Sequence, residues 1–517
     1  MKSVSRLWDG KREVAFLAIV FGLVVLSRLP FHTQGVESFD AVNYMLAIDH
    51  FDMRLGQPQP PGYILYILIA RVANALTGDP HRALLLVSQV FSGAAVVAMY
   101  LAGKEIFGRV VGAIAALLLA TSPLFWYTGG VAVPYVPDLA FGTAAAWLAY
   151  RAMASEKRGI PWAAAISLGL AGAFRLQTLM FLFPLFLFAL RKHHWMHILA
   201  GTAVAGGIFA AFFLPSVYAS GGIRAFLDAL FAIVPALSAN ASSAGYLQRL
   251  VDNATLTARH ILGAIGELLL PLALVGLMAL PEKRSERQKE LLNFLLLWVV
   301  PTWLVCLFIG PGNIGTIQVT TGPYYLLAAF AISVLVASLR FRRLGWALLA
   351  LVVVAHSVLF TLLPYRPFGE HYRAFYTYDT IRSTTANYQK RMDLIRAYPS
   401  DQTVVIAREF RLVQYYLPQY QVFSVPEFDP SRPEEVKSII AVRHNRVEYL
   451  HDLHLEDVMP PGTRYVIFYD LHLVKVPLDG AKLEPVGSGE AQIHVMRLPK
   501  NCQVDWTPEG LSTIPPE

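Results

Sequence analysis

The sequence is poor in charged residues and in cysteine, and both shortages narrow what the protein can be. Only 15% of its 517 residues are charged, whereas ordinary soluble domains carry about 25%. Its two cysteines, Cys306 and Cys502, are too few for a disulfide framework or for a metal site built from cysteines. The sequence also lacks internal repeats, low-complexity tracts and the glycine patterns of nucleotide-binding loops, so no motif points to a nucleotide cofactor.

The sequence is instead rich in hydrophobic residues, which make up 55% of the chain. They gather in runs close to the roughly 20 residues that a helix needs to cross a bilayer, and about eleven crossings are expected. A shorter run, 61–77, follows a Pro-Pro-Gly breaker and is expected to lie on the outer surface of the membrane or to dip into it. The expected spans are 14–30, 83–106, 110–128, 137–154, 161–177, 178–190, 197–218, 261–280, 292–310, 323–339 and 344–363.

Short basic clusters between these runs predict the orientation, because cytoplasmic loops of membrane proteins are enriched in Lys and Arg. The segment 161–190 decides the scheme: as one helix it would run about 45 Å, too long for a hydrocarbon core of about 30 Å. Two short helices that turn near Arg175–Thr178 are therefore expected. The N-terminus is expected to be an uncleaved, cytoplasmic start of the first helix. The clusters placed in the cytoplasm are MKSVSRLWDGKR, KEIFGR, SEKRG, RKHH, PEKRSERQK and RFRR.

This arrangement accounts for the net charge of +7 without a nucleic-acid partner.

The character of the chain changes after about residue 364, where strand-like runs separated by Pro, Asp and Gly replace the apolar spans. These runs are TVVIA (403–407), YQVFSV (420–425) and RYVIFY (464–469). We therefore expect a mainly α, polytopic membrane module over 1–363 and a small extracytoplasmic α/β domain over 364–517. The protein is expected in the plasma (inner) membrane, among membrane lipids.

Two acidic residues stand where the chain should be leaving the membrane: Asp40, after the first span, and Asp138, at the start of a later one. A carboxylate at a membrane boundary has a desolvation cost, so it usually has a partner or a function. An ionised Asp40 outside the membrane could deprotonate an acceptor hydroxyl. The alternative is that each aspartate caps its helix; for Asp40 the spacing leaves the two readings even.

Arg175 lies inside a long apolar stretch and therefore needs an anionic partner, either an acidic side chain or a lipid phosphate. Gln177 could add a hydrogen-bond donor, and a structural ion pair is the alternative role for Arg175. The glycine-rich loop 309–325 is expected outside, where its backbone or Tyr324 could approach a substrate.

An Asp in the first outer loop, the string PPGY (60–63), a second Asp opening the fourth helix and a multi-span body together resemble the GT-C glycosyltransferases. The branch is that of the protein mannosyltransferases and aminoarabinose transferases, and the resemblance is strongest over about 35–180. Members move a sugar from a polyprenyl-phosphate carrier to an acceptor outside the cytoplasm, usually with inversion. The resemblance thus implies a lipid-linked sugar donor and a lipid, glycan or protein acceptor.

Carried over residue by residue, the resemblance makes Asp40 the catalytic base and Asp138 a second catalytic acidic residue. It makes Arg175 the cation that holds the carrier phosphate. Related bacterial sequences often read His-Pro-Pro-Gly-Tyr, whereas Gln59 stands here and is a poor metal ligand. The remaining expected substrate-binding residues are Gln59, Gln177, Tyr63, Tyr135 and Tyr324.

No cofactor is required by this reading, although two carboxylates could hold a divalent cation. A multi-span transporter or lipid flippase is the main alternative function, since transporters also carry ionisable residues in their spans. The clustering of the acidic residues at one face and the lack of a repeat favour an enzyme. A non-catalytic scaffold that presents the C-terminal domain is a further alternative, and it would tolerate Asp40→Asn.

Overall fold

The structure is a computed structural model that describes residues 10–155, 159–231, 246–265, 269–280, 286–310, 314–367, 376–424, 438–443, 446–451, 460, 462–470, 483–498, 503–507 and 510–514. The chain divides into two compact units. The first contains Met1–Thr33 and Tyr44–Ile381, and the second contains Gln34–Asn43 and Arg382–Glu517. The division thus differs from the predicted boundary at 363/364, because a short segment near the N-terminus groups with the C-terminal unit.

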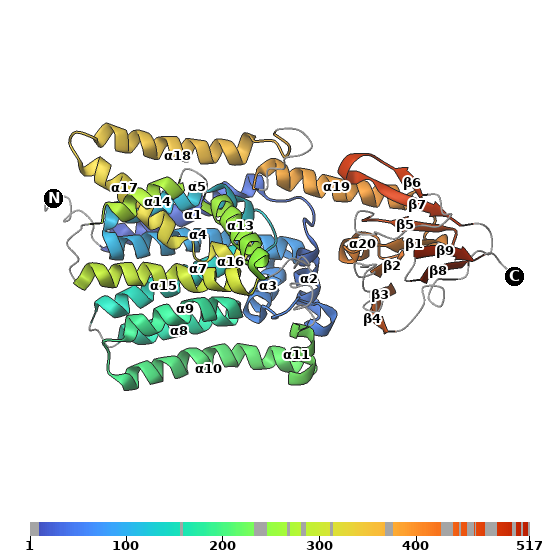
Figure 1. The fold of residues 1–517 in the computed structure, drawn as a ribbon, viewed down its shortest axis with the longest axis horizontal. Coiled ribbons are helices and arrows are strands. Elements are labelled where there is room, and N and C mark those ends of the chain that lie inside the picture. The colour runs from blue at the N-terminus through green and yellow to red at the C-terminus, as the bar shows by residue number, and fades with distance from the viewer. Residues whose placement is uncertain are drawn as a thin grey trace. The chain divides into compact units, whose positions relative to one another are not determined.

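The first unit is a bundle of helices (Figure 1). Its helices in the N-terminal half are α1 (Gly10–Arg28), α2 (Phe39–Asp49, which begins in the second unit), α3 (Ile64–Thr77), α4 (Pro80–Phe107), α5 (Arg109–Thr121), α6 (Pro123–Gly129), α7 (Tyr135–Ala154), α8 (Gly159–Phe174) and α9 (Leu176–Leu190). Those that follow are α10 (Trp195–Ala219), α11 (Ile223–Phe231), α13 (Tyr246–Ile265), α14 (Leu269–Met278), α15 (Glu286–Phe308), α16 (Ile314–Gln318), α17 (Gly322–Ala337) and α18 (Arg342–Leu362).

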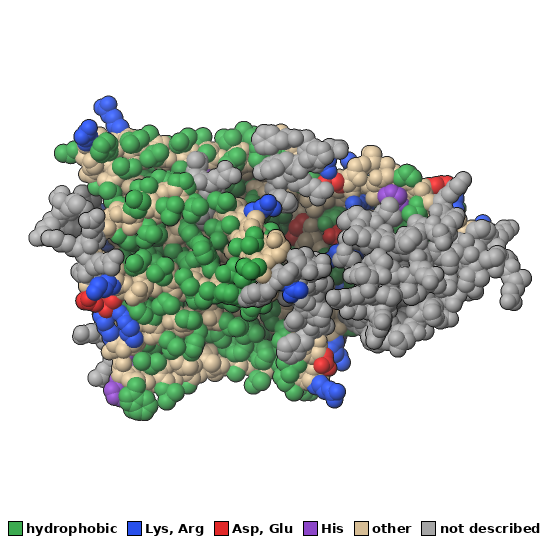
Figure 2. Space-filling view, viewed as in Figure 1, with side chains coloured by type: hydrophobic (Ala, Val, Ile, Leu, Met, Phe, Trp, Pro, Cys, Tyr) green, Lys and Arg blue, Asp and Glu red, His purple; other side chains and the backbone are tan. Residues whose placement is uncertain are grey.

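The bundle has the apolar surface of a membrane protein. Five of its described helices are long and apolar enough to cross a bilayer, or six if the bent pair α5 and α6 is one span. The α10 span is only 11% buried, so most of its apolar surface faces outward. Figure 2 shows hydrophobic side chains covering the visible face of the bundle, with charged side chains gathered toward the ends of the helices. The prediction of a helical, polytopic membrane module is confirmed.

The predicted hairpin over 161–190 is also confirmed, because α8 ends at Phe174 and α9 begins at Leu176. The turns from α9 to α10 and from α17 to α18 lie at the end of the bundle where the N-terminus lies (Figure 1). The basic strings RKHH and RFRR therefore share one end, as the topology requires. That this end faces the cytoplasm stays a prediction.

Two of the expected spans were wrong in detail. The run 110–128 is broken into α5 and α6, bent by 62°, because Pro123 has no N–H with which to continue the ladder. The run 261–280 is not one helix, since α13 already begins at Tyr246 and α14 follows after residue 268. The first three turns of α13 mix apolar and polar residues at helical spacing, so a hydropathy average detects only its last turns.

The second unit is an α/β domain, as predicted. Its helices are the part of α19 (Tyr378–Arg396) that follows Ile381, and α20 (Phe410–Tyr416); short 3-10 turns lie at Ser400–Gln402 and Gly489–Ala491. Strands β1 and β2 are parallel neighbours, and β1 also pairs in parallel with β5. All four residues of β1 are buried, as is usual for a central strand that is covered on both faces.

The seven-stranded sheet has the order β4-β3-β2-β1-β5-β7-β6, and β8 pairs with β9 in a separate hairpin. The three predicted strands correspond to β1, β2 and β5, which are adjacent. The strands are β1 (Thr403–Ile406), β2 (Gln421–Ser424), β3 (Ser438–Arg443), β4 (Arg446–His451), β5 (Tyr465–Phe468), β6 (Leu483–Val486), β7 (Ile493–Arg497), β8 (Gln503–Thr507) and β9 (Gly510–Ile514).

Candidate active site

Asp40 lies in the first turn of α2 but does not cap the helix. The cap is Ser38, whose Oγ accepts the N–H of Ala41 at 3.1 Å. The Asp40 side chain is half-buried, and burial raises the pKa of its carboxyl from 3.8 to about 6. The group is therefore mostly ionised at neutral pH and still basic enough to accept a proton, which suits a general base.

Asp138 and Arg175 form a fully enclosed ion pair inside the first unit. Arg175 Nη1 donates to Asp138 Oδ2 at 3.1 Å, and the two side chains are 2% and 0% exposed. Thr178 Oγ1 donates to Asp138 Oδ1 at 2.6 Å, and Arg175 Nη2 donates to Thr316 Oγ1 at 3.1 Å. The structure thus brings together two predicted site residues and supplies the acidic partner that Arg175 requires.

The backbone explains how this pair forms. Arg175 is extended, with φ −150° and ψ 118°, at the break between α8 and α9, so its side chain leaves the chain where the helix is interrupted. Asp138 lies one turn inside α7, four residues after Pro134, so it is not the helix cap either. The hydrogen bond between Arg175 and Asp138 is that of a structural ion pair, which was the alternative role considered for Arg175.

The PPGY string forms a rigid corner lined with aromatic rings. Gln59 Nε2 donates to the Tyr44 hydroxyl at 2.8 Å, and the Tyr44 ring meets the rings of Tyr63 and Tyr66 edge-on, at 5.4 Å and 5.2 Å between centroids. Gly62 has φ +105°, and a Cβ there would lie 2.8 Å from Met53 Sδ, so this close turn requires glycine.

A small opening, with room for about one water molecule, lies beside this corner. Its walls come from the start of α3, from the α8–α9 turn and from α10, so the residues on either side of Arg175 belong to its lining. The lining is mostly apolar and aromatic: Pro61, Tyr63, Ile64, Gly172, Ala173, Phe174, Leu176, Phe209, Phe213 and Ser216. This lining is apolar enough to contact a lipid chain, but the opening is much smaller than the ligand pockets usual in proteins.

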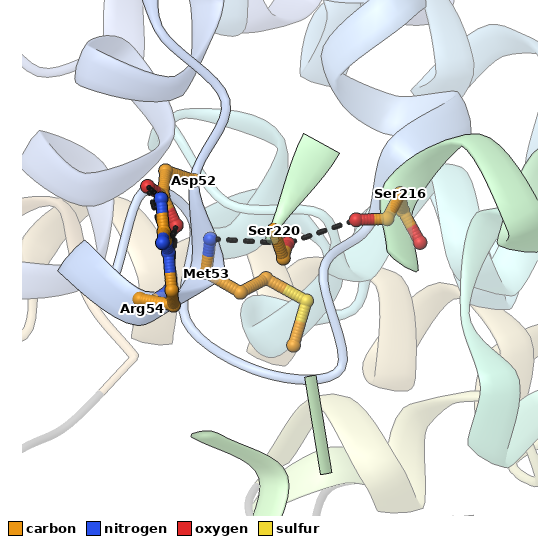
Figure 3. Close-up of polar contacts among 5 residues, drawn as sticks. All are labelled: Asp52, Met53, Arg54, Ser216 and Ser220. Carbon is orange, nitrogen blue, oxygen red and sulfur yellow. Dashed lines mark hydrogen bonds and ion pairs between the residues drawn. The ribbon is translucent and has the colours of Figure 1, made fainter. Parts of the chain in front are cut away.

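A hydrogen-bonded clip, which sequence reasoning missed, fixes the loop before PPGY to the end of α10 (Figure 3). The Met53 N–H donates to Ser220 Oγ at 3.4 Å, and Ser220 Oγ donates to the Ser216 carbonyl at 2.8 Å. Asp52 caps the 3-10 turn Met53–Leu55 and pairs with Arg54 at 2.6 Å.

The other predicted site residues are spread over the first unit. The Tyr135 ring faces the Arg175 guanidinium, with 6.0 Å from Cζ to the centroid. Gln177 and Tyr324 are half-buried on α9 and α17, and no contact seen in the described residues joins either to Asp138. Part of the glycine-rich loop, 311–313, lies outside the described residues.

Arg28 is a second buried cation, at the end of α1, that sequence reasoning missed. Its Nη2 donates to the Ala120 carbonyl at 2.8 Å, close to where the α5–α6 bend interrupts the helical ladder. Its guanidinium lies over the ring of Trp126, 4.9 Å from the centroid. The pairing of a cation with the C-terminus of α5 indicates a structural role. The signal in the sequence was a lone Arg near the end of an apolar span.

The part of the chain that the structure describes holds no group of three or more His, Cys, Asp or Glu side chains that could bind a metal ion. The two carboxylates considered for a divalent cation, Asp40 and Asp138, belong to different units. Asp138 already bonds Arg175 and Thr178.

Comparisons with known proteins agree with this architecture. Residues 59–219 match the family model described as dolichyl-phosphate-mannose-protein mannosyltransferase. A sequence search of curated proteins finds no significant match. The fold is similar to that of ArnT from Cupriavidus metallidurans bound to undecaprenyl phosphate, at 11% identity and TM-score 0.55, over 95% of this chain and 99% of that chain.

The apo oligosaccharyltransferase of Archaeoglobus fulgidus is also similar, at 13% identity and TM-score 0.50, over 90% of this chain and 70% of that chain. At these identities the likeness establishes the fold, and it extends over both units. These findings agree with the predicted resemblance: the chain has a fold similar to that of ArnT, and its residues 59–219 match the mannosyltransferase family model.

Proposed function

We propose that the protein is a membrane glycosyltransferase that moves a sugar from a polyprenyl-phosphate carrier to an acceptor on the extracytoplasmic side. The observation that supports this most directly is the family match over 59–219. That stretch contains Asp138, Arg175 and every residue that lines the apolar opening. The ArnT structure with a similar fold holds undecaprenyl phosphate, which is the class of carrier proposed here.

In the proposed reaction Asp40 is the general base. Its carboxylate takes the proton of an acceptor hydroxyl as the oxygen attacks the anomeric carbon from the face opposite the phosphate. The bond from that carbon to the phosphate oxygen breaks, and the electron pair leaves with the lipid phosphate, so the sugar inverts. Because the phosphate is already a good leaving group, the protein contributes mainly by positioning the reactants and by the base.

The apolar lining of this opening is the proposed contact surface for the first part of the carrier chain, whose binding would widen the opening. Phe174, Phe209 and Phe213 supply wide apolar surfaces, and α10 exposes most of its span toward the lipid. Arg175 lies between two lining residues in the sequence, and its proposed role is to hold the carrier phosphate, for which its enclosed guanidinium would have to open toward that end. Asp138 then acts as its supporting partner, with Gln59, Gln177, Tyr63, Tyr135 and Tyr324 as further substrate contacts.

The test is sugar transfer in proteoliposomes, with a radiolabelled polyprenyl-phosphate sugar as donor. Asp40→Asn preserves the shape of the side chain but removes the base, so the rate should fall by about 100-fold or more. Asp49→Asn, at the exposed end of the same helix, is the matched control and should retain activity. Normal transfer by both Asp40→Asn and Asp40→Ala would reject Asp40 as the base.

A further inference from the structure

The segment that carries Asp40 is part of the C-terminal unit, although it lies more than 300 residues earlier in the sequence. Residues Gln34–Asn43 group with Arg382–Glu517. Val36 is 1% exposed and Glu37 is 7% exposed, so the segment is embedded rather than laid on a surface. The candidate base Asp40 thus lies on a segment that packs within the C-terminal unit.

Two side chains of α20 hold this segment. The Val36 N–H donates to the Tyr416 hydroxyl at 2.9 Å. The ring of Phe39, the residue directly before Asp40, meets the ring of Phe410 edge-on at 5.4 Å. One contact fixes the backbone four residues before Asp40, and the other fixes the side chain next to it.

Helix α19 also contacts the segment, at Gly35. A Cβ on Gly35 would lie 2.8 Å from Thr385 Cγ2 and 3.0 Å from the Tyr416 hydroxyl. Contacts of this length force a neighbour to move, so the segment can approach α19 and α20 this closely only with glycine here. Gly35, Val36 and Phe39 thus make three separate contacts with the same pair of helices.

From these contacts we propose that the C-terminal unit positions the catalytic base, with Tyr416 and Phe410 as the positioning residues that hold Gln34–Asn43. The proposal rests on the function proposed for Asp40. In this proposal neither Tyr416 nor Phe410 contacts the substrate. A general base must come within about 3 Å of the proton that it removes, and a misplacement of about 1 Å can cost about 100-fold in rate.

We expect the same contacts to limit the access of water to Asp40. Burial raises the pKa of Asp40 to about 6, so loosening the segment should hydrate the carboxylate and lower its pKa toward the ordinary value of 3.8. The acidic limb of the pH–rate profile would then move to lower pH. The other titratable or charged groups on the segment and on α20 with its N-cap are Glu37, Glu409, Arg411, Tyr415 and Tyr416. Those on the part of α19 in this unit are Arg382, Tyr388, Lys390, Arg391, Asp393 and Arg396.

Tyr416→Phe tests the proposal because it removes one hydroxyl and keeps the ring. In the proteoliposome assay kcat should fall about 10- to 100-fold with the KM for the lipid-linked donor unchanged, and the acidic limb should move below pH 6. Gly35→Ala should act in the same direction. The matched control is Tyr420→Phe, whose hydroxyl bonds the carbonyls of Ile395 and Tyr398 in the same unit, away from the segment.

Hydrogen exchange measured on the same full-length variants separates this proposal from the proposed function. The amides of residues 34–43 should exchange faster in Tyr416→Phe and remain protected in Tyr420→Phe. The positioning role of Tyr416 is wrong if Tyr416→Phe leaves both the exchange rates and the acidic limb of the pH–rate profile as in the wild type. It is also wrong if Tyr420→Phe shifts that limb by the same amount. If exchange changes as expected but Asp40→Asn is fully active, the positioning contacts stand and the base assignment fails.

Discussion

At the scale of single residues, two buried cations of the first unit have defined polar partners. Arg175 and Asp138 are enclosed together, and Arg28 bonds the Ala120 carbonyl beside a helix break. Burying a charge in an apolar bundle is costly unless it is paired and hydrogen-bonded. Each of these cations binds its partner near a break in a helix. Arg175 lies at the break between α8 and α9, and Arg28 bonds Ala120 next to the break at Ser122 between α5 and α6.

The Asp138–Arg175 pair predicts a strongly non-additive double-mutant cycle. Either single change, Asp138→Asn or Arg175→Met, should lower the free energy of unfolding by about 3–5 kcal/mol, because it leaves the other charge buried without its partner. The double variant should lose less than either single variant. Thermal unfolding of the purified protein in detergent measures this coupling.

The same variants distinguish a purely structural role of Arg175 from a role in binding the carrier phosphate. If Arg175 also holds the carrier phosphate, the double variant should recover stability but still bind the lipid-linked donor poorly. Stability and donor affinity that recover together would restrict Arg175 to its structural pairing with Asp138. Additive stability losses would contradict the pair itself.

At the scale of elements, the parallel strands of the C-terminal unit bring two carboxyl groups together at their carboxyl ends. Asp470 follows β5 and accepts the N–H groups of Arg408 and Glu409, each at 3.1 Å, which ties the turn after β1 to the end of β5. Arg391 of α19 pairs with Asp470 at 3.4 Å. Burial, together with the nearby charge of Asp470, raises the pKa of Glu409 to about 7.

This raised pKa predicts how stability depends on pH. Between the ordinary value of 4.5 and about 7, the folded state binds more protons at Glu409 than the unfolded state does. The free energy of unfolding therefore falls as pH rises through this window and levels off above it. Glu409→Gln should remove that loss and raise the melting temperature at pH 8, where the gain is about 1 kcal/mol once solvent screening at a half-exposed group is allowed for.

Melting of the full-length protein at pH 5 and pH 8 provides the measurement. The melting temperature of Glu409→Gln should exceed that of the wild type by more at pH 8 than at pH 5. Glu484→Gln, an exposed carboxylate on β6, should follow the wild type at both values. An equal difference at the two pH values would show that Glu409 does not titrate in this window.

At the scale of the whole molecule, the sequence predicts what depends on local composition and fails on what depends on distant contacts. The α8–α9 hairpin followed from the length of the apolar run and from the position of the basic string RKHH, and the strands β1, β2 and β5 followed from short apolar runs. The grouping of Gln34–Asn43 with the C-terminal unit did not, because a hydrogen bond between Val36 and Tyr416 spans 380 positions. The Asp138 partner of Arg175 was likewise one of several that the sequence allowed.

The largest prediction still to be tested is orientation, and single cysteines can test it in intact cells with a reagent that does not cross membranes. Lys192→Cys lies in the turn from α9 to α10, and Arg342→Cys lies at the start of α18. Figure 1 shows this turn and the turn from α17 to α18 at the same end of the bundle. These two cysteines should react only after permeabilisation, because basic loops stay in the cytoplasm. Arg82→Cys, at the exposed start of α4, and Asp401→Cys, in the second unit, should react without it. Opposite labelling of Lys192→Cys and Arg342→Cys would contradict the fold, whereas inversion of all four would reverse the orientation and place Asp40 on the side away from the proposed acceptor.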